Sequence, residues 1–250
     1  MTATDSRLPI RALVISAMPQ EMAPMHAILE ANPGSGAPIP SPIGRITQWQ
    51  TPTDSVVCAV TGIGFAATAS CLGWLLAHYA PQMLVSIGSA GGLSAESRVR
   101  ELVLGTSYRD GGADGSAFGY VRGQVPGQPE YFSADAAMLE TLRSTLADPN
   151  GPLADIATRE GEVLSSDTFV TDSNVGDMRE AFPAAVSADM ESYAAAHVAH
   201  QWGIPFISLR AISDLCASPE DQAISFHAEL SEVAEISARS AWELVAPRER

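Results

Sequence analysis

The sequence contains no lysine, and all fourteen basic residues of the 250-residue chain are arginines. A Schiff-base mechanism, pyridoxal chemistry and the phosphate-binding lysine of a P-loop each need a side-chain amine, so these chemistries are excluded. Low lysine content is equally expected from genome composition alone. The twenty-nine acidic residues leave a net charge of −15. Nucleic acids and anionic membrane surfaces bind basic patches, so we expect neither as a partner.

Cysteine is also scarce, with Cys58, Cys71 and Cys216 and no C-x-x-C spacing. Cys58 and Cys71 stand in apolar runs, where a thiol usually packs as a small hydrophobe. Neither a disulfide nor a structural zinc site is therefore expected. No apolar run reaches the ~18 to 20 residues of a membrane helix, and the polar stretch 1–9 lacks the core of a signal peptide. We expect a cytoplasmic protein with a disordered tail over residues 1–9.

Hydrophobic residues make up 46% of the sequence, and no Pro/Gly/Ser-rich linker divides it, which indicates one domain over residues 1–250. Strands that alternate with helices predict an α/β fold, with a mostly parallel mixed β-sheet flanked by helices on both faces. The Pro/Gly-rich stretch 32–42 is expected to be a loop. Strands are expected at 11–17, 43–50, 55–60, 83–87, 101–108, 156–165 and 204–212, and helices at 18–30, 64–79, 133–146, 175–182, 190–202 and 224–245.

Polar residues gather where the predicted strands end. Glu21 follows the first strand, Ser89 follows the strand at 83–87, Asp214 follows the last strand, and Glu191 opens the helix before it. Ligands of α/β sheets bind beyond the carboxyl ends of the strands. Each residue alone is as well explained by a helix cap or a surface carboxylate. Four of them at the sheet ends together indicate a site.

Two of these carboxylates suggest specific chemistry. Asp214 stands among Ala211, Ile212 and Leu215, and a carboxyl in apolar surroundings has a raised pKa that suits a proton donor. Capping of the segment that follows is the alternative. Glu191 can accept two hydrogen bonds, as the vicinal hydroxyls of a ribose would offer. Acids at a helix start equally complement the helix dipole.

Other patterns are weaker. The glycine turns at 62–64 and 88–92 do not form the G-x-G-x-x-G dinucleotide fingerprint. His197 and His200 are spaced as a metal pair could be, but no nearby carboxylate completes a metal site. A packed histidine pair is therefore the preferred interpretation, and we expect neither a metal nor a cofactor.

Five stretches carry a resemblance to a known family: IGSAGGL at 87–93, ADGSAFGYVRGQVPG at 113–127, SSDTFV at 165–170, DMES at 189–192 and RAISD at 210–214. With these motifs the chain resembles the bacterial 5′-methylthioadenosine/S-adenosylhomocysteine nucleosidases, within the purine nucleoside phosphorylase superfamily. The likeness runs from about residue 11 to the C-terminal helix. The second stretch is less general to the superfamily and points to this nucleosidase branch.

The resemblance implies a role for each matching residue. Asp214 would protonate purine N7, Glu21 would orient and deprotonate the attacking water, and Glu191 would bind the ribose hydroxyls. Phe169 would stack on adenine, while the backbone of Val170 would read the base edge. The other residues that would line the water, base, sugar and 5′-alkylthio positions are Ser89, Ala90, Gly91, Arg210, Ser213, Met190, Met18, Ile63 and Phe226.

The resemblance also implies a homodimer. Phe118, Tyr120 and Pro126 match positions that the family contributes across a dimer interface. They stand in the long irregular stretch 109–132, whose repeated glycines favour a loop that would bury aromatic rings poorly within its own subunit. Irregular segments of this length tend to be functional. We therefore expect the neighbouring subunit to complete the alkylthio pocket.

Four positions depart from the family pattern. Pro19-Gln20 replaces two of the acids that usually precede the one at Glu21, and Phe65 replaces a basic residue. Asp189 stands for a glutamate one methylene longer, which puts its support of Glu191 in question.

The implied reaction is hydrolysis of the glycosidic bond of 5′-methylthioadenosine, S-adenosylhomocysteine or 5′-deoxyadenosine. A phosphate nucleophile needs several cationic or N–H donors, and the segment 16–22 offers no charged donor. Three alternatives stay open: a futalosine-type nucleoside hydrolase, a purine nucleoside phosphorylase, and a nucleoside-binding or storage protein. A loss of the catalytic acids would mark the last class, yet Glu21 and Asp214 are both present.

Overall fold

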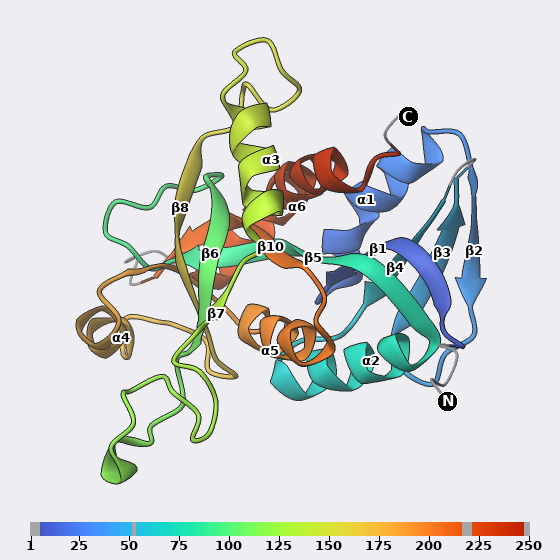
Figure 1. The fold of residues 1–250 in the computed structure, drawn as a ribbon. Coiled ribbons are helices and arrows are strands. Elements are labelled where there is room, and N and C mark those ends of the chain that lie inside the picture. The colour runs from blue at the N-terminus through green and yellow to red at the C-terminus, as the bar shows by residue number, and fades with distance from the viewer. Residues whose placement is uncertain (1–5, 52–53, 217–221, 248–250) are drawn as a thin grey trace.

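Strands and helices alternate along most of the chain (Figure 1). The computed structural model describes residues 6–51, 54–216 and 222–247. Its strands are β1 (Leu8–Ser16), β2 (Ser35–Ile39), β3 (Arg45–Gln50), β4 (Ser55–Val60), β5 (Tyr79–Gly92), β6 (Leu102–Asp110), β7 (Phe132–Ser133), β8 (Thr158–Ser165), β9 (Ala185–Asp189) and β10 (Phe206–Leu215). Its helices are α1 (Pro19–Glu30), α2 (Phe65–His78), α3 (Ala136–Leu146), α4 (Val175–Ala181), α5 (Ser192–Trp202) and α6 (Gln222–Val245), with a 3₁₀ turn at Ser116–Phe118.

The apolar run of β1 is buried on both faces of the sheet. Leu13 and Ile15 belong to the apolar cluster on one face, and Ala12 and Val14 belong to the cluster on the other. The alternation follows from the two-residue period of a strand. A continuous apolar run is therefore what a strand covered on both faces requires.

The ten strands form one mixed sheet, with the order β10-β6-β8-β9-β5-β1-β4-β3-β2 and with β7 paired to β6. An additional parallel pairing joins β10 to β5. The strands β5, β10, β6, β8 and β9 consequently close into a ring, while β1, β4, β3 and β2 extend from it. The carboxyl ends of the parallel strands β1, β5 and β10 meet on one side.

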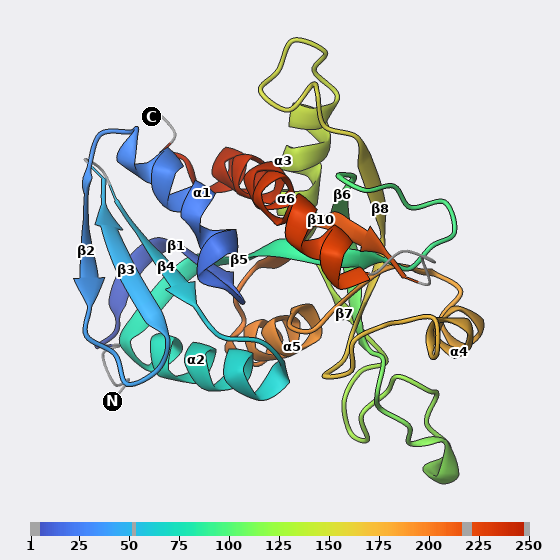
Figure 2. The same ribbon diagram turned by 180° about the vertical axis from the view of Figure 1, so that it is seen from behind.

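Helices cover both faces of this sheet, as Figures 1 and 2 show. Helices α1, α3 and α6 lie over one face, and α2 and α5 lie over the other, while α4 stands at the far edge beside β8. The predicted α/β class with a mixed sheet between two helical layers is confirmed. Among the described residues, no helix combines the length and the apolar character needed to cross a bilayer.

Three strands were not predicted, namely β2, β9 and the two-residue β7, because their side chains do not mark them. Strand β2 lies in the expected loop at 32–42, and it pairs with β3 through main-chain bonds. A β-carbon at Gly36 would lie 2.7 Å from the Trp49 ring, so the glycine admits the ring of the neighbouring strand. Strand β9 is short: it has only five residues, and the last of them, Asp189, is the first residue of the 189–192 motif.

Other boundaries differ by a few residues. Strand β1 begins at Leu8, so residues 8 and 9 are part of the sheet and not of the expected tail; residues 1–5 lie outside the described chain. Helix α3 begins after Asp135, whose carboxylate accepts hydrogen bonds from the amides of Ala137 and Met138, both at 3.0 Å. Such an N-cap fixes where a helix can start.

Candidate active site

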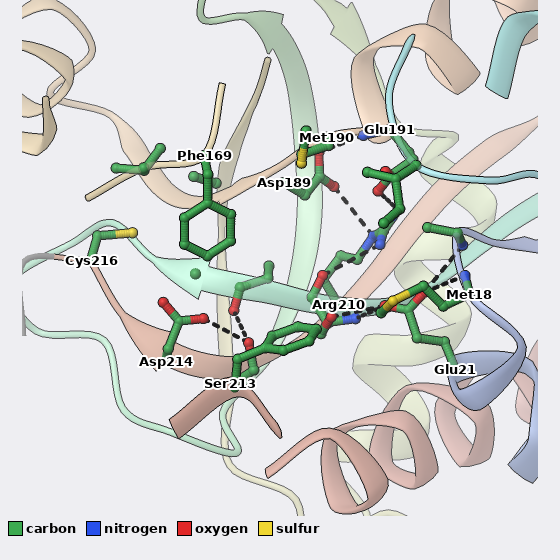
Figure 3. Close-up of a pocket in the computed structure, with 18 of the residues that line it drawn as sticks. Met18, Glu21, Phe169, Asp189, Met190, Glu191, Arg210, Ser213, Asp214 and Cys216 are labelled. Carbon is green, nitrogen blue, oxygen red and sulfur yellow. Dashed lines mark hydrogen bonds and ion pairs between the residues drawn. The ribbon is translucent and has the colours of Figure 1, made fainter. Parts of the chain in front are cut away.

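A cavity of about 220 Å³ opens where β1, β5, β9 and β10 end (Figure 3). Eleven of its lining positions were expected from the catalytic, sugar, base and alkylthio roles, three more are the predicted glycine-turn residues at 89–91, and Asp189 was expected beside them. The lining residues are Ala17, Met18, Glu21, Ile63, Ser89, Ala90, Gly91, Thr168, Phe169, Val170, Ala188, Asp189, Met190, Glu191, Arg210, Ser213, Asp214, Cys216 and Phe226.

Glu21 joins the first turn of α1 to β5. Its Oε2 accepts hydrogen bonds from the amides of Ala17 at 3.1 Å and Met18 at 3.0 Å, which is the capping interaction that the sequence left as an alternative. Its Oε1 accepts from the Ser89 amide at 2.9 Å and from Ser89 Oγ at 2.8 Å. The carboxylate is thus fixed from two elements, although a helix cap needs only one.

Gly88 makes this approach possible. Its φ is +145°, which favours glycine, and a β-carbon there would lie 2.5 Å from Glu21 Oε1 and 2.8 Å from Arg210 Nη1. The strand can therefore carry no side chain where the carboxylate and the guanidinium meet.

Arg210 lies at the centre of the polar floor and is 1% exposed. Its Nη2 is 3.3 Å from Glu191 Oε2, and its Nε is 3.2 Å from Asp189 Oδ2, an ion pair outside hydrogen-bond geometry. It also donates to the Ser89 carbonyl at 3.3 Å and to Ser86 Oγ at 3.0 Å. One cation therefore faces several carboxylates, so the floor of the cavity is negative.

Asp189 supports this floor despite its short side chain. Its Oδ1 accepts from Ser165 Oγ at 2.5 Å and from the amides of Glu191 at 3.3 Å and Ser192 at 3.2 Å. Ser192 Oγ also donates to Asp189 Oδ2. The hydroxyls of the two serines reach the carboxylate, which resolves the question raised by the missing methylene.

Glu191 precedes α5 and reaches toward the turn at 62–64. Its Oε1 accepts from the Gly64 amide at 3.0 Å. Burial raises the pKa of Glu191 to about 7; the Arg210 charge lowers that pKa, and the charges of Asp189 and Glu21 raise it. A proton is consequently bound far more tightly here than at an exposed glutamate.

Asp214 lies inside β10, not after it, because this strand extends to Leu215. The pairing of β10 with β5 shifts register between Ile212 and Asp214, and such an irregularity re-aims side chains. Asp214 is 2% exposed, and Ser213 Oγ donates to its Oδ1 at 2.8 Å. The acid and Phe169 share one end of the cavity, and Glu21 and Met18 share the other (Figure 3).

Apolar side chains form the remaining walls. Phe169 is 50% exposed and Ile63 is 56% exposed, although both line the cavity. Val170 is buried among the residues of α4. Large apolar side chains that are half exposed to solvent at the opening of a cavity are suited to contact a ligand or a partner protein.

Three predicted residues lie elsewhere. Phe118, Tyr120 and Pro126 do not line the cavity of their own chain. Phe118 is 83% exposed, in the loop that projects below the molecule in Figure 1. The two histidines, His197 and His200, both pack on the Phe132 ring, with centroid distances of 5.0 and 5.2 Å, in agreement with the packing interpretation.

Four lining residues were not singled out from the sequence: Ala17, Thr168, Ala188 and Cys216. Ala17 and Ala188 present little more than backbone, and no side-chain pattern marks them. Thr168 directly precedes Phe169, and Cys216 stands two residues after Asp214. Their closeness in the sequence to expected site residues was therefore the one signal that could have found them. Cys216 is buried, and burial raises the pKa of its thiol to about 12.

The chain matches the model of the phosphorylase superfamily over residues 11–246. It is 32% identical, over 177 residues, to the 5′-methylthioadenosine/S-adenosylhomocysteine nucleosidase of Tolumonas auensis; the match covers 70% of this chain and 75% of that protein. The nucleosidase of Neisseria meningitidis in complex with methylthio-immucillin-A is 30% identical with a TM-score of 0.83, covering 94% of this chain and 98% of that one.

A third relative is the nucleosidase of Colwellia psychrerythraea in complex with adenine. It is 26% identical with a TM-score of 0.82, and 94% of each chain is covered. The resemblance inferred from the five sequence motifs is thus confirmed by both sequence and fold. The chain belongs to the phosphorylase superfamily and, within it, to the 5′-methylthioadenosine/S-adenosylhomocysteine nucleosidase family.

Proposed function

We propose that this protein is an N-glycosyl hydrolase that cleaves 5′-methylthioadenosine, S-adenosylhomocysteine or both, releasing adenine and the 5-thioribose product. The observation that carries the proposal is the placement of three carboxyl groups around one cavity. Asp214 lies at one end, and Glu21 and Glu191 lie toward the other, on either side of Arg210 (Figure 3). 5′-Deoxyadenosine is a further candidate substrate, because it also lacks a 5′-hydroxyl.

Asp214 acts on the leaving base in this proposal. When the bond between C1′ and N9 breaks, its electron pair moves into the adenine ring. The Asp214 carboxyl donates its proton to N7 and so neutralises the charge that develops there, a contribution of ~10² to 10⁴ in rate for general acid catalysis. Phe169 stacks on the base at the same end of the cavity.

Glu191 acts on the sugar. Its carboxylate accepts hydrogen bonds from the ribose hydroxyls, while Met190 contacts the ring. The transition state is a cation with oxocarbenium character, and fixed negative charge close to it lowers its energy. The floor formed by Asp189, Glu191 and Glu21 around Arg210 supplies that charge.

Glu21 acts on the nucleophile. It accepts a proton from a water molecule whose oxygen bonds to C1′, while Ser89 and Arg210 border the water position. The proton released by water offsets the one given to adenine, so the reaction is balanced. Four hydrogen bonds already fix the Glu21 carboxylate, and a fixed base loses little entropy in the reaction.

Water is favoured over phosphate on electrostatic grounds. Phosphate sites need several cationic or N–H donors. Among the described lining residues, Arg210 is the sole cation, and its guanidinium already pairs with two carboxylates. A dianion would therefore meet the carboxylates of Glu21 and Glu191 without a free positive partner.

A homodimer is part of the proposal. Phe118 is 83% exposed and Val121 is 44% exposed, and both stand on the projecting loop. Exposed apolar groups on a loop favour a protein contact, and the open mouth between Ile63 and Phe169 needs further apolar cover. Sedimentation of a fully active monomer at assay concentration would contradict this assembly. The cytoplasmic location and the single domain over residues 1–250 stay predictions.

Product analysis tests the proposed function. The protein is incubated with methylthioadenosine in the absence and in the presence of excess phosphate, and Asp214→Asn serves as the matched inactive variant. We expect adenine and methylthioribose in both buffers. Ribose 1-phosphate products would indicate a phosphorylase, and tight nucleoside binding without turnover would indicate a binding protein. A panel with S-adenosylhomocysteine, 5′-deoxyadenosine and aminofutalosine ranks the substrates.

A further inference from the structure

Helix α4 sends one charged side chain to the ends of two strands that form the site. Arg179 Nε donates to the Leu93 carbonyl at 2.6 Å, and its Nη2 donates to the Cys216 carbonyl at 3.3 Å. Leu93 directly follows β5, and Cys216 directly follows β10. Because both acceptors are main-chain carbonyls, the guanidinium fixes backbone and not another side chain.

The backbone fixed in this way is the part of β10 that carries Asp214. Beyond the register shift, Asp214 pairs with Gly91 and Leu215 pairs with Gly92. The Cys216 amide then donates to the Gly92 carbonyl at 3.1 Å. Between the register shift and the end of β10, therefore, only two residue pairs of regular hydrogen-bonded ladder join this strand to β5. Arg179 binds both chains at the point where this short ladder stops.

The same helix is packed against the base end of the cavity. Val170, Val175, Met178 and Cys216 belong to one apolar cluster, and Phe169 directly precedes the first of them. The segment that stacks on the base, the helix and the end of β10 thus form one packed unit, in which Arg179 makes the polar connection. Replacement of Arg179 should therefore displace Asp214 through this packed unit, while the residues around the sugar and the water position stay in place.

We propose that Arg179 is a positioning residue for the general acid: by binding the carbonyls of Leu93 and Cys216 it holds Asp214 where it can reach the purine. This inference rests on the proposed function of Asp214. Arg179 is absent from the residues that line the cavity, so it acts through Asp214 and not on the substrate. Its loss should lower the rate of steps that need the proton and should spare steps that do not.

Two substrates separate these steps. The first is methylthioadenosine, whose base must be protonated to leave. The second is the same methylthioribosyl group carrying 4-nitrophenolate, which leaves without a proton and is followed by its absorbance. Arg179→Gln, Arg179→Lys and Asp214→Asn are measured on both. The ratio of the two rates within one preparation does not depend on the folded fraction, so a partly unfolded variant still gives a result.

A matched control is Arg239→Gln. Arg239 also donates to a main-chain carbonyl, that of Pro152 at 2.6 Å, but it stands on α6 and does not line the cavity. Its replacement removes the same kind of bond, together with an ion pair to Asp155, from a place without a role in the site, and we expect both substrates to react at the wild-type rate.

For Arg179→Gln we expect kcat on methylthioadenosine to fall about 10- to 100-fold, as misplacement of a reacting group by ~1 Å costs, with little change in KM. The rate on the nitrophenyl riboside should stay near that of the wild type, and Arg179→Lys should recover part of the loss. An equal loss on both substrates, or no loss on methylthioadenosine, would overturn the inference. Failure of the wild type to release adenine would instead refute the proposed function itself.

Discussion

Replacement of Gly88 by alanine tests whether the geometry around Glu21 governs the reaction. The added β-carbon would lie 2.5 Å from Glu21 Oε1 and 2.8 Å from Arg210 Nη1. Both atoms belong to buried side chains at the end of the cavity assigned to water. The substitution introduces no charge and removes no hydrogen-bonding group, so its effect on the rate reports on the positions of these two side chains.

The expected magnitude follows from these distances. Ordinary van der Waals contact begins at 3.4 Å, so the Glu21 oxygen must retreat by 3.4 − 2.5, or about 0.9 Å, and a displacement of ~1 Å costs about 100-fold in rate. The φ of +145° at Gly88 adds strain for any other residue, of order 1 to 3 kcal/mol in stability. We therefore expect kcat/KM to fall about 100-fold and the melting temperature to drop.

The assay is steady-state adenine release from methylthioadenosine well below the melting temperature, with circular dichroism as the check of folding. Gly176→Ala is the matched control: Gly176 lies in α4, and a β-carbon there meets no atom within 4 Å. It should keep full activity and become slightly more stable, since alanine is favoured over glycine in helices. A folded Gly88→Ala enzyme that keeps wild-type kcat/KM would show that Glu21 does not place the nucleophile.

Three further predictions concern the carboxylates and the 5′ pocket. Asp214→Asn should fold normally yet lose most of its kcat, and retention of more than about a tenth would contradict general acid catalysis. Burial raises the pKa of Glu191 from 4.5 to about 7, so its stabilising contribution should be full below pH 4.5 and lost as the pH rises through 7. Melting curves of the wild type and Glu191→Gln across this range should then differ in slope, and parallel curves would refute the raised pKa. Adenosine should react ~5- to 150-fold less efficiently than methylthioadenosine, because its 5′-hydroxyl is stranded among Met18, Ile63 and Phe226; equal kcat/KM values would exclude an apolar pocket.

The sequence predicted the elements whose side chains report their burial. Strands such as β1 and β4 are continuous apolar runs, and such runs need two covered faces. Strand β2 could not be found in the same way, because its backbone makes the pairing and its side chains are mostly exposed. The extension of β10 past Ile212 was equally hidden, since a shift in register leaves no mark in the order of side chains.

The residues of the candidate site also fall into those that their side-chain type reveals and those that only the backbone geometry reveals. Glu21, Glu191 and Asp214 could be selected because carboxyl groups near sheet ends suggest chemistry. The roles of Gly88 and Arg179 could not be inferred, because one acts by having no side chain and the other by binding main-chain carbonyls. Such contributions depend on distances between segments far apart in the sequence.

The ring formed by β5, β10, β6, β8 and β9 has a consequence for how the molecule opens. A strand within a closed ring is bonded on both sides, so its amides cannot exchange with solvent by fraying from an edge. Residues 209–211 of β10 lie between β5 and β6, and the amides of this central part should exchange only when the whole ring opens. β2, bonded on one side to β3, can separate at much lower free energy. The acid-bearing strand thus belongs to the last unit to open, and the hairpin at the far edge can vary without disturbing it.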